Sequence, residues 1–377
     1  MNSVSLLKHS SYEKNLKEKI NESIVLVNGY EGISHGDTVL IKPNFVTARP
    51  AESCVNTHPL FIKALAELLY ERGAKIQIGD SPAVMKGSDV AKKLGLLELL
   101  SPYNAKFIDF TGAVTPKFSN NSSQNFHFKQ IKLASEIFEV DHLINAAKLK
   151  SHAQMGVTLC TKNLFGCVTG HRKTQWHYHT GRDLDIFAQL LIEIALASNA
   201  KLHLLDGIWA MAGNGPTNGY KIEPNVILAS KNSLSLDRVV LEIVNKNPNV
   251  FPMFRAAEKM GLHDSINLSN IKILGSMPEE SRLESFEMPK LKNLKFTNNA
   301  LIQKLIASFV DQKMTVDHTS CIKCKKCIDQ CPAKAMTLSD KVIINHNICI
   351  RCCCCQEICP VGALALKDST IGKLFSK

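Results

Sequence analysis

CIKCKKCIDQCP (residues 321–332) and CIRCCCCQEICP (residues 349–360) are two copies of one pattern, C-x₂-C-x₂-C-x₃-C-P. Each cysteine of the first copy has a counterpart 28 residues later in the second copy. The similarity continues past the cysteines, because Ala335, Leu338 and Asp340 recur as Ala363, Leu366 and Asp368. The C-terminal part of the chain is therefore an internal duplication of a small unit.

The spacing of these cysteines predicts two 4Fe–4S clusters. Three cysteines at intervals of two residues wrap the backbone around one cluster, and the fourth, before proline, reaches across to the other. The first cluster is predicted to bind Cys321, Cys324, Cys327 and Cys359. The second is predicted to bind Cys349, Cys352, Cys355 and Cys331. Proline after the crossing cysteine fixes φ and helps to turn the chain away.

Zinc sites and disulfide bonds are the two alternatives to iron–sulfur clusters at these cysteines. Zinc ribbons use C-x₂-C pairs separated by a longer loop, which differs from a triple run with a trailing C-P. A disulfide scaffold requires an oxidising compartment, and no secretory signal is evident in the first residues. Cys353 and Cys354 occupy x positions of the motif. Either could replace a neighbour as a ligand, but we favour free thiols packed beside the cluster.

Composition and charge narrow the class of protein. The chain has 377 residues, a formal net charge of +11 and scattered basic residues without a sustained Lys/Arg run. This pattern does not favour nucleic acid as a partner, and it suits a small anionic substrate or an acidic redox partner protein. The longest apolar stretch, residues 186–198, is too short to span a bilayer. We therefore expect a cytoplasmic protein with no membrane insertion.

The larger N-terminal region is predicted to be an α/β domain with a mostly parallel sheet, followed by a small α+β ferredoxin-like domain. Expected boundaries are 1–297 for the α/β domain, 298–312 for a helical linker, 313–370 for the two-cluster domain and 371–377 for a tail. Strands are expected at residues 4–8, 37–41, 75–79, 105–110, 126–133, 142–147, 201–205, 226–229 and 271–274. Helices are expected after Ser10 and at residues 59–72, 90–100, 184–198 and 236–245. Alternation of this kind is typical of parallel sheets.

Polar side chains follow several of these strands. They are Lys42 and Asn44, Asp80, the series Lys148, Lys150 and His152, and Asp206. Because ligands of parallel α/β sheets bind at the carboxyl ends of strands, these residues are candidates for binding a substrate.

The stretch KLKSHAQMGVTLCTKNLFGCVTGHRKTQWHYH (residues 148–179) combines basic residues and histidines with apolar residues that can anchor it. We interpret it as an anchored loop that binds an anionic ligand or a metal, with Lys162, Asn163 and Lys173 as further candidates. His58, before Pro59, is either a ligand or the cap of the following helix. Cys160 and Cys167 are expected to be buried free thiols.

Several segments of this sequence resemble the DUF362 family: VLIKPNFV (39–46), THP (57–59), GDSPA (79–83), NAAKLKSHAQMGVTLCTKNLFG (145–166) and LLDGIWAMAGNGP (204–216). Members are often fused to a C-terminal two-cluster ferredoxin. The resemblance implies an iron–sulfur protein with a joined α/β domain, commonly regarded as an oxidoreductase. A fainter likeness links the Lys/His segments to lactate-racemase-type proteins, which hold a nickel cofactor.

Three functional hypotheses follow. The first is a redox enzyme that binds a small anion through the lysines, with Lys148, Lys150 and His152 as catalytic residues and His152 as general acid or base. The second is an electron carrier whose α/β domain docks a partner. The third is a non-redox isomerase-type domain whose clusters are structural.

Overall fold

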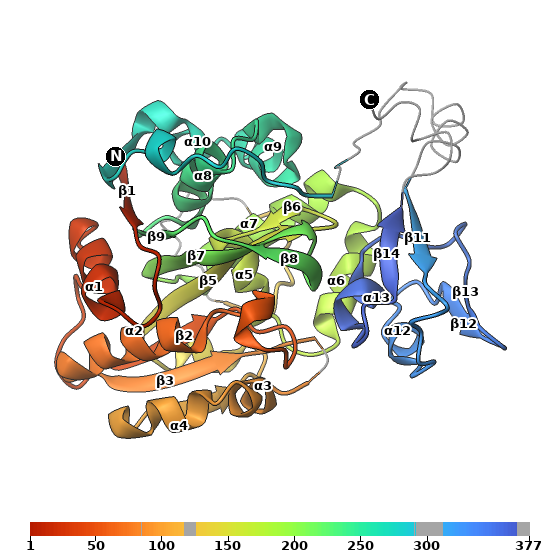
Figure 1. Ribbon diagram of the computed structural model, residues 1–377, viewed down its shortest axis with the longest axis horizontal. Helices are drawn as coiled ribbons and strands as arrows, with labels where there is room; N and C mark the ends of the chain where they lie inside the picture. The colour runs from red at the N-terminus through yellow and green to blue at the C-terminus, as the bar shows by residue number, and fades with distance from the viewer. Residues whose placement is uncertain (84, 117–125, 290, 292–311, 368–377) are drawn as a thin grey trace.

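The computed structural model describes residues 1–83, 85–116, 126–289, 291 and 312–367 (Figure 1). Its N-terminal region contains one large sheet. The strands are β1 (Asn2–Lys8), β2 (Thr38–Pro43), β3 (Lys75–Asp80), β4 (Lys106–Asp109), β5 (His142–His152), β6 (Gly156–Thr158), β7 (Leu202–Asn214), β8 (Asn218–Ile222), β9 (Val226–Ser230) and β10 (Ile271–Gly275).

The sheet has the strand order β10-β1-β9-β7-β5-β2-β3-β4, with β6 added to β5 and β8 added to β7. Along this path the neighbours are parallel, except that β9 is antiparallel to both β1 and β7. The sheet is therefore mixed but mostly parallel, as predicted. The chain runs outward from β2 to β4 and then returns to β5 on the other side of β2, so the connections leave in opposite directions at β2 and β5. A crevice forms at such a switch point.

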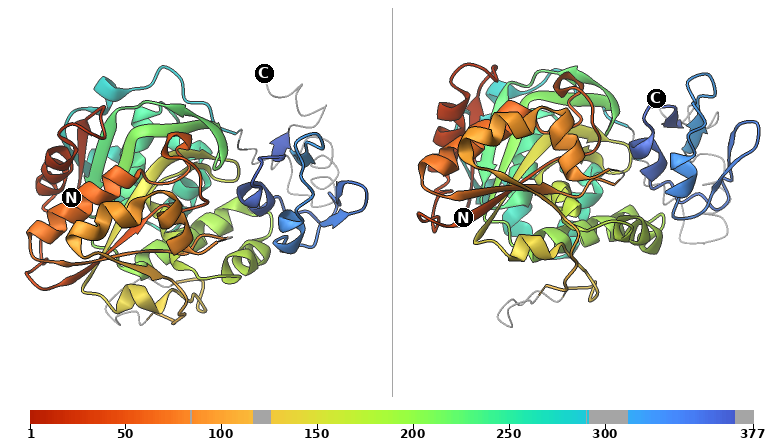
Figure 2. Two further views of the ribbon diagram at one scale, coloured as in Figure 1. Left: turned by 60° about the horizontal axis from the view of Figure 1, so that its bottom comes forward. Right: turned by 90° about the horizontal axis from the view of Figure 1, so that it is seen from below.

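Helices cover both faces of the sheet (Figures 1 and 2). They are α1 (Leu16–Leu26), α2 (Pro59–Glu71), α3 (Gly87–Lys93), α4 (Leu96–Leu100), α5 (Cys160–Asn163), α6 (Arg172–Thr180), α7 (Leu184–Ser198), α8 (Ser233–Ile243), α9 (Pro252–Lys259) and α10 (His263–Ile266). Alternate residues of β2 face opposite sides, because side chains of a strand point to the two faces in turn. Val39 and Ile41 pack with α1 to α4, whereas Leu40 packs with α7 to α9.

Local signals place the helix starts. The Asp183 carboxylate accepts hydrogen bonds from the backbone N–H groups of Asp185 and Ile186, each at 3.0 Å, and so caps α7. At α2, Pro59 occupies the first turn and His58 Nδ1 accepts the Leu60 N–H at 3.2 Å. His58 thus acts as the helix cap. Burying a large side chain such as Phe61 of α2 contributes about 1.5–3 kcal/mol to folding.

Three expectations were wrong. Residues 126–133 form no strand, because the N–H groups of His127 and Phe128 are bound by the Glu193 carboxylate instead of a neighbouring strand. The helix expected at 90–100 is divided into α3 and α4 at Gly95, which has a φ of 67°. The segment 148–179 is no loop: it contains the end of β5, the antiparallel strand β6, and helices α5 and α6.

The C-terminal module preserves its duplication in three dimensions. It contains β11 (Lys313–Val316), α12 (Lys326–Asp329), β12 (Met336–Leu338), β13 (Val342–Ile344), α13 (Cys354–Ile358) and β14 (Leu364–Lys367). Each short helix begins directly before the third cysteine of a motif, and β12 and β14 follow at equivalent positions. β11 pairs with β14, and β12 with β13, both antiparallel.

The expected linker lies outside the described residues except for Gln312, as does the expected tail. None of the helices in the described ranges has the length and apolar character needed to cross a bilayer. The C-terminal module packs beside β8 and α6 of the large domain (Figure 1).

Candidate functional site: a cavity between the two parts of the chain

A cavity of about 100 Å³ lies at the switch point of the sheet, between the large domain and the C-terminal module. A cavity of roughly 10–15 Å³ on this measure already holds one water, so the space is large enough for a small organic ligand. The lining includes most of the site residues expected from the sequence: Lys42, Asn44, Asp80, Lys150, His152, Lys162, Asn163 and Lys173. Glu357 and Cys354 of the C-terminal module also contribute to the wall.

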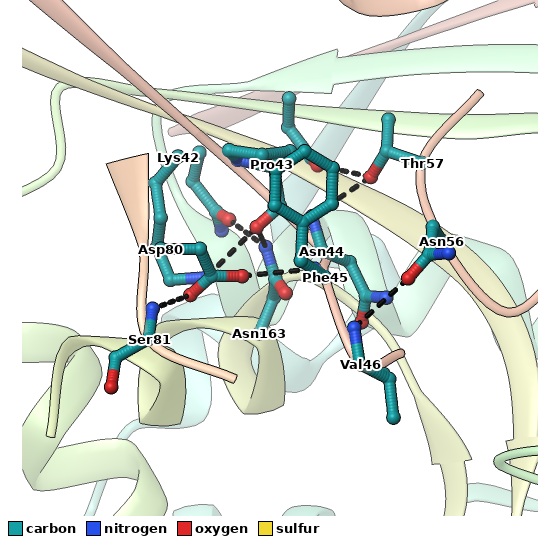
Figure 3. A network of polar contacts seen from close by, with 12 residues as sticks. Lys42, Pro43, Asn44, Phe45, Val46, Asn56, Thr57, Asp80, Ser81 and Asn163 are labelled. Carbon is teal, nitrogen blue, oxygen red and sulfur yellow. Dashed lines mark hydrogen bonds and ion pairs between the residues drawn. The ribbon is translucent and has the colours of Figure 1, made fainter. Parts of the chain in front are cut away.

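The ends of β2 and β3 form one wall through a buried ion pair (Figure 3). Lys42 Nζ lies 2.8 Å from Asp80 Oδ1 and also donates to the Pro43 carbonyl at 2.9 Å. The other carboxylate oxygen, Oδ2, accepts the Phe45 N–H at 2.9 Å. Asp80 therefore holds the β2 loop and the Lys42 ammonium in place, so its carboxylate is engaged in shaping the wall.

Asn44 and Asn163 are engaged in the same wall (Figure 3). Asn44 Nδ2 donates to the Val55 carbonyl at 2.9 Å. Asn163 Nδ2 donates to Asn145 Oδ1 at 2.7 Å and to the Pro43 carbonyl at 3.3 Å. These amides fix the position of α5 against the end of β2.

Gly166 allows the chain after α5 to approach the ion pair. A Cβ atom at this position would clash with Asp80 Oδ1, Lys42 Nζ and Lys42 Cε. The glycine is needed for close approach of the backbone to a buried pair, a role that its lack of a side chain permits.

β5 carries Lys148, Lys150 and His152 on one face, because alternate residues of a strand share a face. Lys150 is almost fully buried, and its Nζ donates to the Val55 carbonyl at 2.8 Å. Burial, reinforced by the charge of Lys162, lowers the pKa of Lys150 to about 7. Lys150 can therefore exchange a proton at neutral pH.

His152 is held in one neutral tautomer. Its Nδ1 accepts the backbone N–H groups of Gln154 at 3.0 Å and Met155 at 3.3 Å, which leaves the proton on Nε2. Nε2 then donates to Glu357 Oε1 at 2.9 Å. Burial lowers the pKa of His152 to about 4. Since both ring nitrogens are engaged, the geometry suits His152 to positioning and suits Lys150 to proton exchange.

Glu357 is ionised in this setting. Burial alone would raise its pKa, but the hydrogen bond from His152 and the positive charge of Lys162 lower it to about 2. The cavity therefore contains four lysines and two carboxylates, and positive charge predominates when the lysines are protonated.

Lys162 and Lys173 supply further positive charge. Burial lowers the pKa of Lys162, and within the described part of the chain its Nζ has no hydrogen-bond or ion-pair partner. Burial also lowers the pKa of Lys173 to about 8, and its Nζ donates to the Ser81 carbonyl. Two buried atoms of lining residues, Thr158 Oγ1 and His177 Nδ1, also have no hydrogen-bond partner among the residues that the structure describes. Unpartnered polar groups of this kind are costly unless a ligand or water satisfies them.

Lys148 and Asp206 are not among the residues that line the cavity. They form a separate buried ion pair of 2.8 Å, and Lys148 Nζ also donates to the Tyr12 hydroxyl at 3.0 Å. That hydroxyl donates to Asp206 Oδ1 at 2.6 Å, and the Tyr12 ring stacks on His58 with 3.6 Å between centroids. The structure gives this pair a role in joining α1, β5 and β7.

The cysteines of the first predicted set surround a hollow on the far side of the module. Cys321, Cys324, Cys327 and Cys359 all line it. Burial and the neighbouring thiols of Cys324, Cys359 and Cys321 raise the pKa of Cys327 to about 11. Thiols that converge in this way become thiolates when a metal group balances their charge.

The second set is gathered similarly. Burial and the thiols of Cys352, Cys353, Cys349 and Cys331 raise the pKa of Cys355. No group of three or more His, Cys, Asp or Glu side chains in the described ranges is arranged to hold a single metal ion. The four thiols around the hollow of the first set fit an iron–sulfur cluster, because thiolates are its usual ligands. The eight cysteines would hold two such groups.

The remaining cysteines are buried or partly buried free thiols. Cys160 and Cys167 lie in the core of the large domain, as predicted. Cys353 is buried in the module, whereas Cys354 lines the cavity. The Cys354 thiol lies close enough to Cys352, which belongs to the second predicted set, to lower the pKa of Cys352. The second set therefore lies one side chain away from the cavity.

Polar contacts fix the module on the large domain. Arg182 Nη2 donates to the Cys349 carbonyl at 2.7 Å. Gln356 Nε2 donates to Asn214 Oδ1 at 3.2 Å, and Arg49 Nη2 donates to the Pro360 carbonyl at 3.3 Å. These contacts keep α13 against the end of β5, where Glu357 completes the wall of the cavity.

Glu357, Cys354, Thr158 and His177 are site residues that sequence reasoning did not identify. Glu357 carried no signal, because an acidic residue also stands at the equivalent position of the first motif, Asp329, which is exposed. Thr158 and His177 lie in β6 and α6, two elements that the hydrophobic pattern did not reveal.

Comparisons with known proteins agree with this division of the chain. The model of the DUF362 family, a domain of unknown function, matches residues 39–242, which hold all the cavity lysines. The model of a 4Fe-4S binding domain matches residues 314–337, which include the first cysteine motif. A thylakoid-associated protein of Synechocystis sp. is 35% identical over 292 residues, covering 77% of this chain and 88% of that protein.

Two solved structures are similar at a low level. The lactate racemase apoprotein from Thermoanaerobacterium thermosaccharolyticum has a TM-score of 0.37 and 12% identity, over 58% of this chain and 53% of that one. A structural-genomics protein from Thermotoga maritima has a TM-score of 0.35 and 14% identity, over 68% of this chain and 60% of that one. The chain thus spans less than two thirds of the length of either.

Proposed function

The chain belongs to the DUF362 family, and from this membership and the geometry of the cavity we propose that the protein is an iron–sulfur oxidoreductase acting on a small anionic substrate. The observation that carries the proposal is the shared cavity wall. Four lysines come from the large domain, and Cys354 and Glu357 come from α13, which also carries Cys355 of the second cysteine set. When bound, iron–sulfur clusters supply electrons one at a time.

The anion is bound first by Lys162. Its half-buried ammonium has no hydrogen-bond or ion-pair partner among the described residues, so it is free to bind a carboxylate or similar oxyanion in the cavity. Lys173, on the same wall as the Lys42–Asp80 pair, adds a second positive charge. A single negative charge between these lysines would balance half of the excess that four protonated lysines and two carboxylates leave.

Lys150 moves the proton. With a pKa of about 7, its Nζ can release a proton to the substrate or take one up as the charge of the substrate changes. The Val55 carbonyl orients the ammonium from behind. His152 and Glu357 position the helix α13 at the cavity and exclude water from this side.

Binding and turnover can be tested together on anaerobically reduced protein. Short carboxylates, 2-oxo acids and inorganic oxyanions are added one at a time. A ligand that fits should raise the midpoint of thermal unfolding, and a substrate should speed the recovery of visible absorption as the reduced protein is reoxidised.

The key variant is Lys162→Met, with Lys201→Met as the matched control because Lys201 is exposed outside the cavity. We expect Lys162→Met to abolish both effects while the iron content stays unchanged. Equal responses in Lys162→Met and wild type would overturn the proposal. A shift in thermal midpoint without any change in absorption would instead favour the isomerase-type hypothesis, and no response to any ligand would favour the electron carrier.

A further inference from the structure

The two copies of the cysteine motif lie in different surroundings. The second copy faces the large domain: Cys352 and Cys353 are buried, and the Cys349 carbonyl is bound by Arg182. In the first copy Cys324 is exposed, and of residues 321–332 only Gln330 lines the cavity next to the large domain. The side of the module that carries the first copy is therefore available to another molecule.

The exposed side has an apolar centre and a basic rim. Ile322 and Val361 are 61% and 41% exposed. Lys323, Lys325 and Lys326 are exposed around them, and all five residues line the same hollow as the first cysteine set. We call these five residues the lysine face. No acidic residue lines this hollow in the described part of the chain.

The lysines are not explained by the backbone. Lys323 and Lys325 have positive φ values of 53° and 62°, a region that disfavours most residues other than Gly, Asn and Asp. The equivalent residues of the second copy, Arg351 and Cys353, have nearly the same φ values of 57° and 62°. Arg351 is basic like Lys323, but Cys353 adopts the same conformation as Lys325, so the backbone does not require lysine at that position of the first copy.

We propose that the lysine face docks a small acidic electron-carrier protein next to the first cysteine set. Three like charges around exposed apolar side chains suit a partner with a negatively charged rim, and such charges mainly accelerate and orient the encounter. Electron-transfer complexes are small and transient, which agrees with a face of a few residues. The inference concerns the outer side of the module, so a failure of substrate binding in the cavity would leave it intact.

The test measures binding instead of turnover. Full-length protein with its iron–sulfur groups is titrated with an oxidised, strongly acidic flavodoxin by calorimetry under anaerobic conditions. We expect micromolar affinity at low ionic strength, weakening by about tenfold or more as salt approaches physiological concentration, because exposed charges are screened.

The variant Lys323→Glu/Lys325→Glu/Lys326→Glu should abolish binding at every salt concentration. The matched control is Lys14→Glu/Lys75→Glu/Lys272→Glu, which changes the net charge equally at exposed lysines of the large domain. The control should keep its affinity within about twofold. If the triple Glu variant loses iron, the triple Gln variant at the same three positions is used in its place. The Gln variant should bind flavodoxin much more weakly than wild type while its visible absorption is unchanged.

Three results would overturn the proposal. One is no binding of flavodoxin at low salt, and another is an equal loss of affinity in the control, which would mean that only net charge matters. The third is binding of a duplex RNA of equal charge with the same affinity and the same dependence on these lysines. That outcome would identify the face as a polyanion site.

Discussion

His152 on β5 and Glu357 on α13 meet across the boundary between the two parts of the chain, with 2.9 Å between Nε2 and Oε1 although 205 residues separate them in sequence. Because two backbone N–H groups donate to Nδ1, the ring proton is on Nε2, and this is the neutral tautomer that can donate to Glu357. The cavity is closed on one side by this contact, and its loss should loosen the module.

The first prediction concerns that contact. Glu357→Ala should weaken the docking of the module by about 1.5–3 kcal/mol, the value of a hydrogen bond to a charged group. Amide hydrogen exchange should speed up in β6 and α13. Asp329→Ala is the control, because Asp329 stands at the equivalent position of the first motif and is exposed. Similar exchange in the two variants would contradict the role given to Glu357.

The second prediction concerns Gly166. Gly166→Ala places a methyl group against the Lys42–Asp80 pair and should destabilise the large domain by about 1–3 kcal/mol. Thermal unfolding under anaerobic conditions measures the change. Gly170→Ala, whose added methyl group meets nothing within 4 Å, reports only the cost of its positive φ. The prediction fails if Gly166→Ala is the milder of the two.

The third prediction concerns pH. The pKa of Lys150 is lowered from 10.5 to about 7, so between these values the unfolded chain binds more protons than the folded one. Stability contributed through this group therefore rises with pH across that window. Between pH 7 and 10, the free energy of unfolding of the wild type, relative to that of Lys150→Met, should rise by up to about 1.4 kcal/mol per pH unit. If the thermal midpoints of wild type and Lys150→Met change in parallel with pH, burial does not lower the pKa of Lys150.

The fourth prediction concerns the crossed ligation of the cysteines. If the predicted crossed ligation is right, Cys331→Ser removes a ligand of the predicted second cluster, whose other expected ligands are Cys349, Cys352 and Cys355, and iron should fall from about eight to about four per chain. Cys353→Ser should leave the iron content unchanged. Elemental analysis of iron and acid-labile sulfide decides the matter. Loss of iron in Cys353→Ser, with full iron in Cys331→Ser, would reverse the assignment of these two residues.

The sequence predicted the elements with a strong local signal. Helix α7 was expected at its observed bounds because of its long run of apolar residues, and the structure adds Asp183 as its cap. Strands β2, β3 and β5 were expected within a few residues, and so were the polar residues at their carboxyl ends. These predictions succeeded because each depended on neighbouring residues in the chain.

The remainder depended on contacts between distant segments. Glu357 reaches the cavity only because the module docks on β5, and no local pattern encodes that docking. Lys148 shares a face with Lys150, but it lies further inside the sheet, where Asp206 and Tyr12 bind it. The local sequence of residues 126–133 predicted a strand, but in the structure the Glu193 carboxylate accepts the N–H groups of His127 and Phe128.

The duplication gives the module an approximate internal twofold, and a duplicated unit could in principle sit on the large domain in either of two orientations. In the alternative orientation α12 would replace α13, and Asp329 would stand opposite His152. However, Lys325 and Lys326 would then take the places of Cys353 and Cys354, which lie near Lys162. Like charges at a buried boundary repel strongly. Lys325 and Lys326 thus make the reversed arrangement unfavourable. The module therefore docks in a single orientation, in which these two lysines lie outside the cavity.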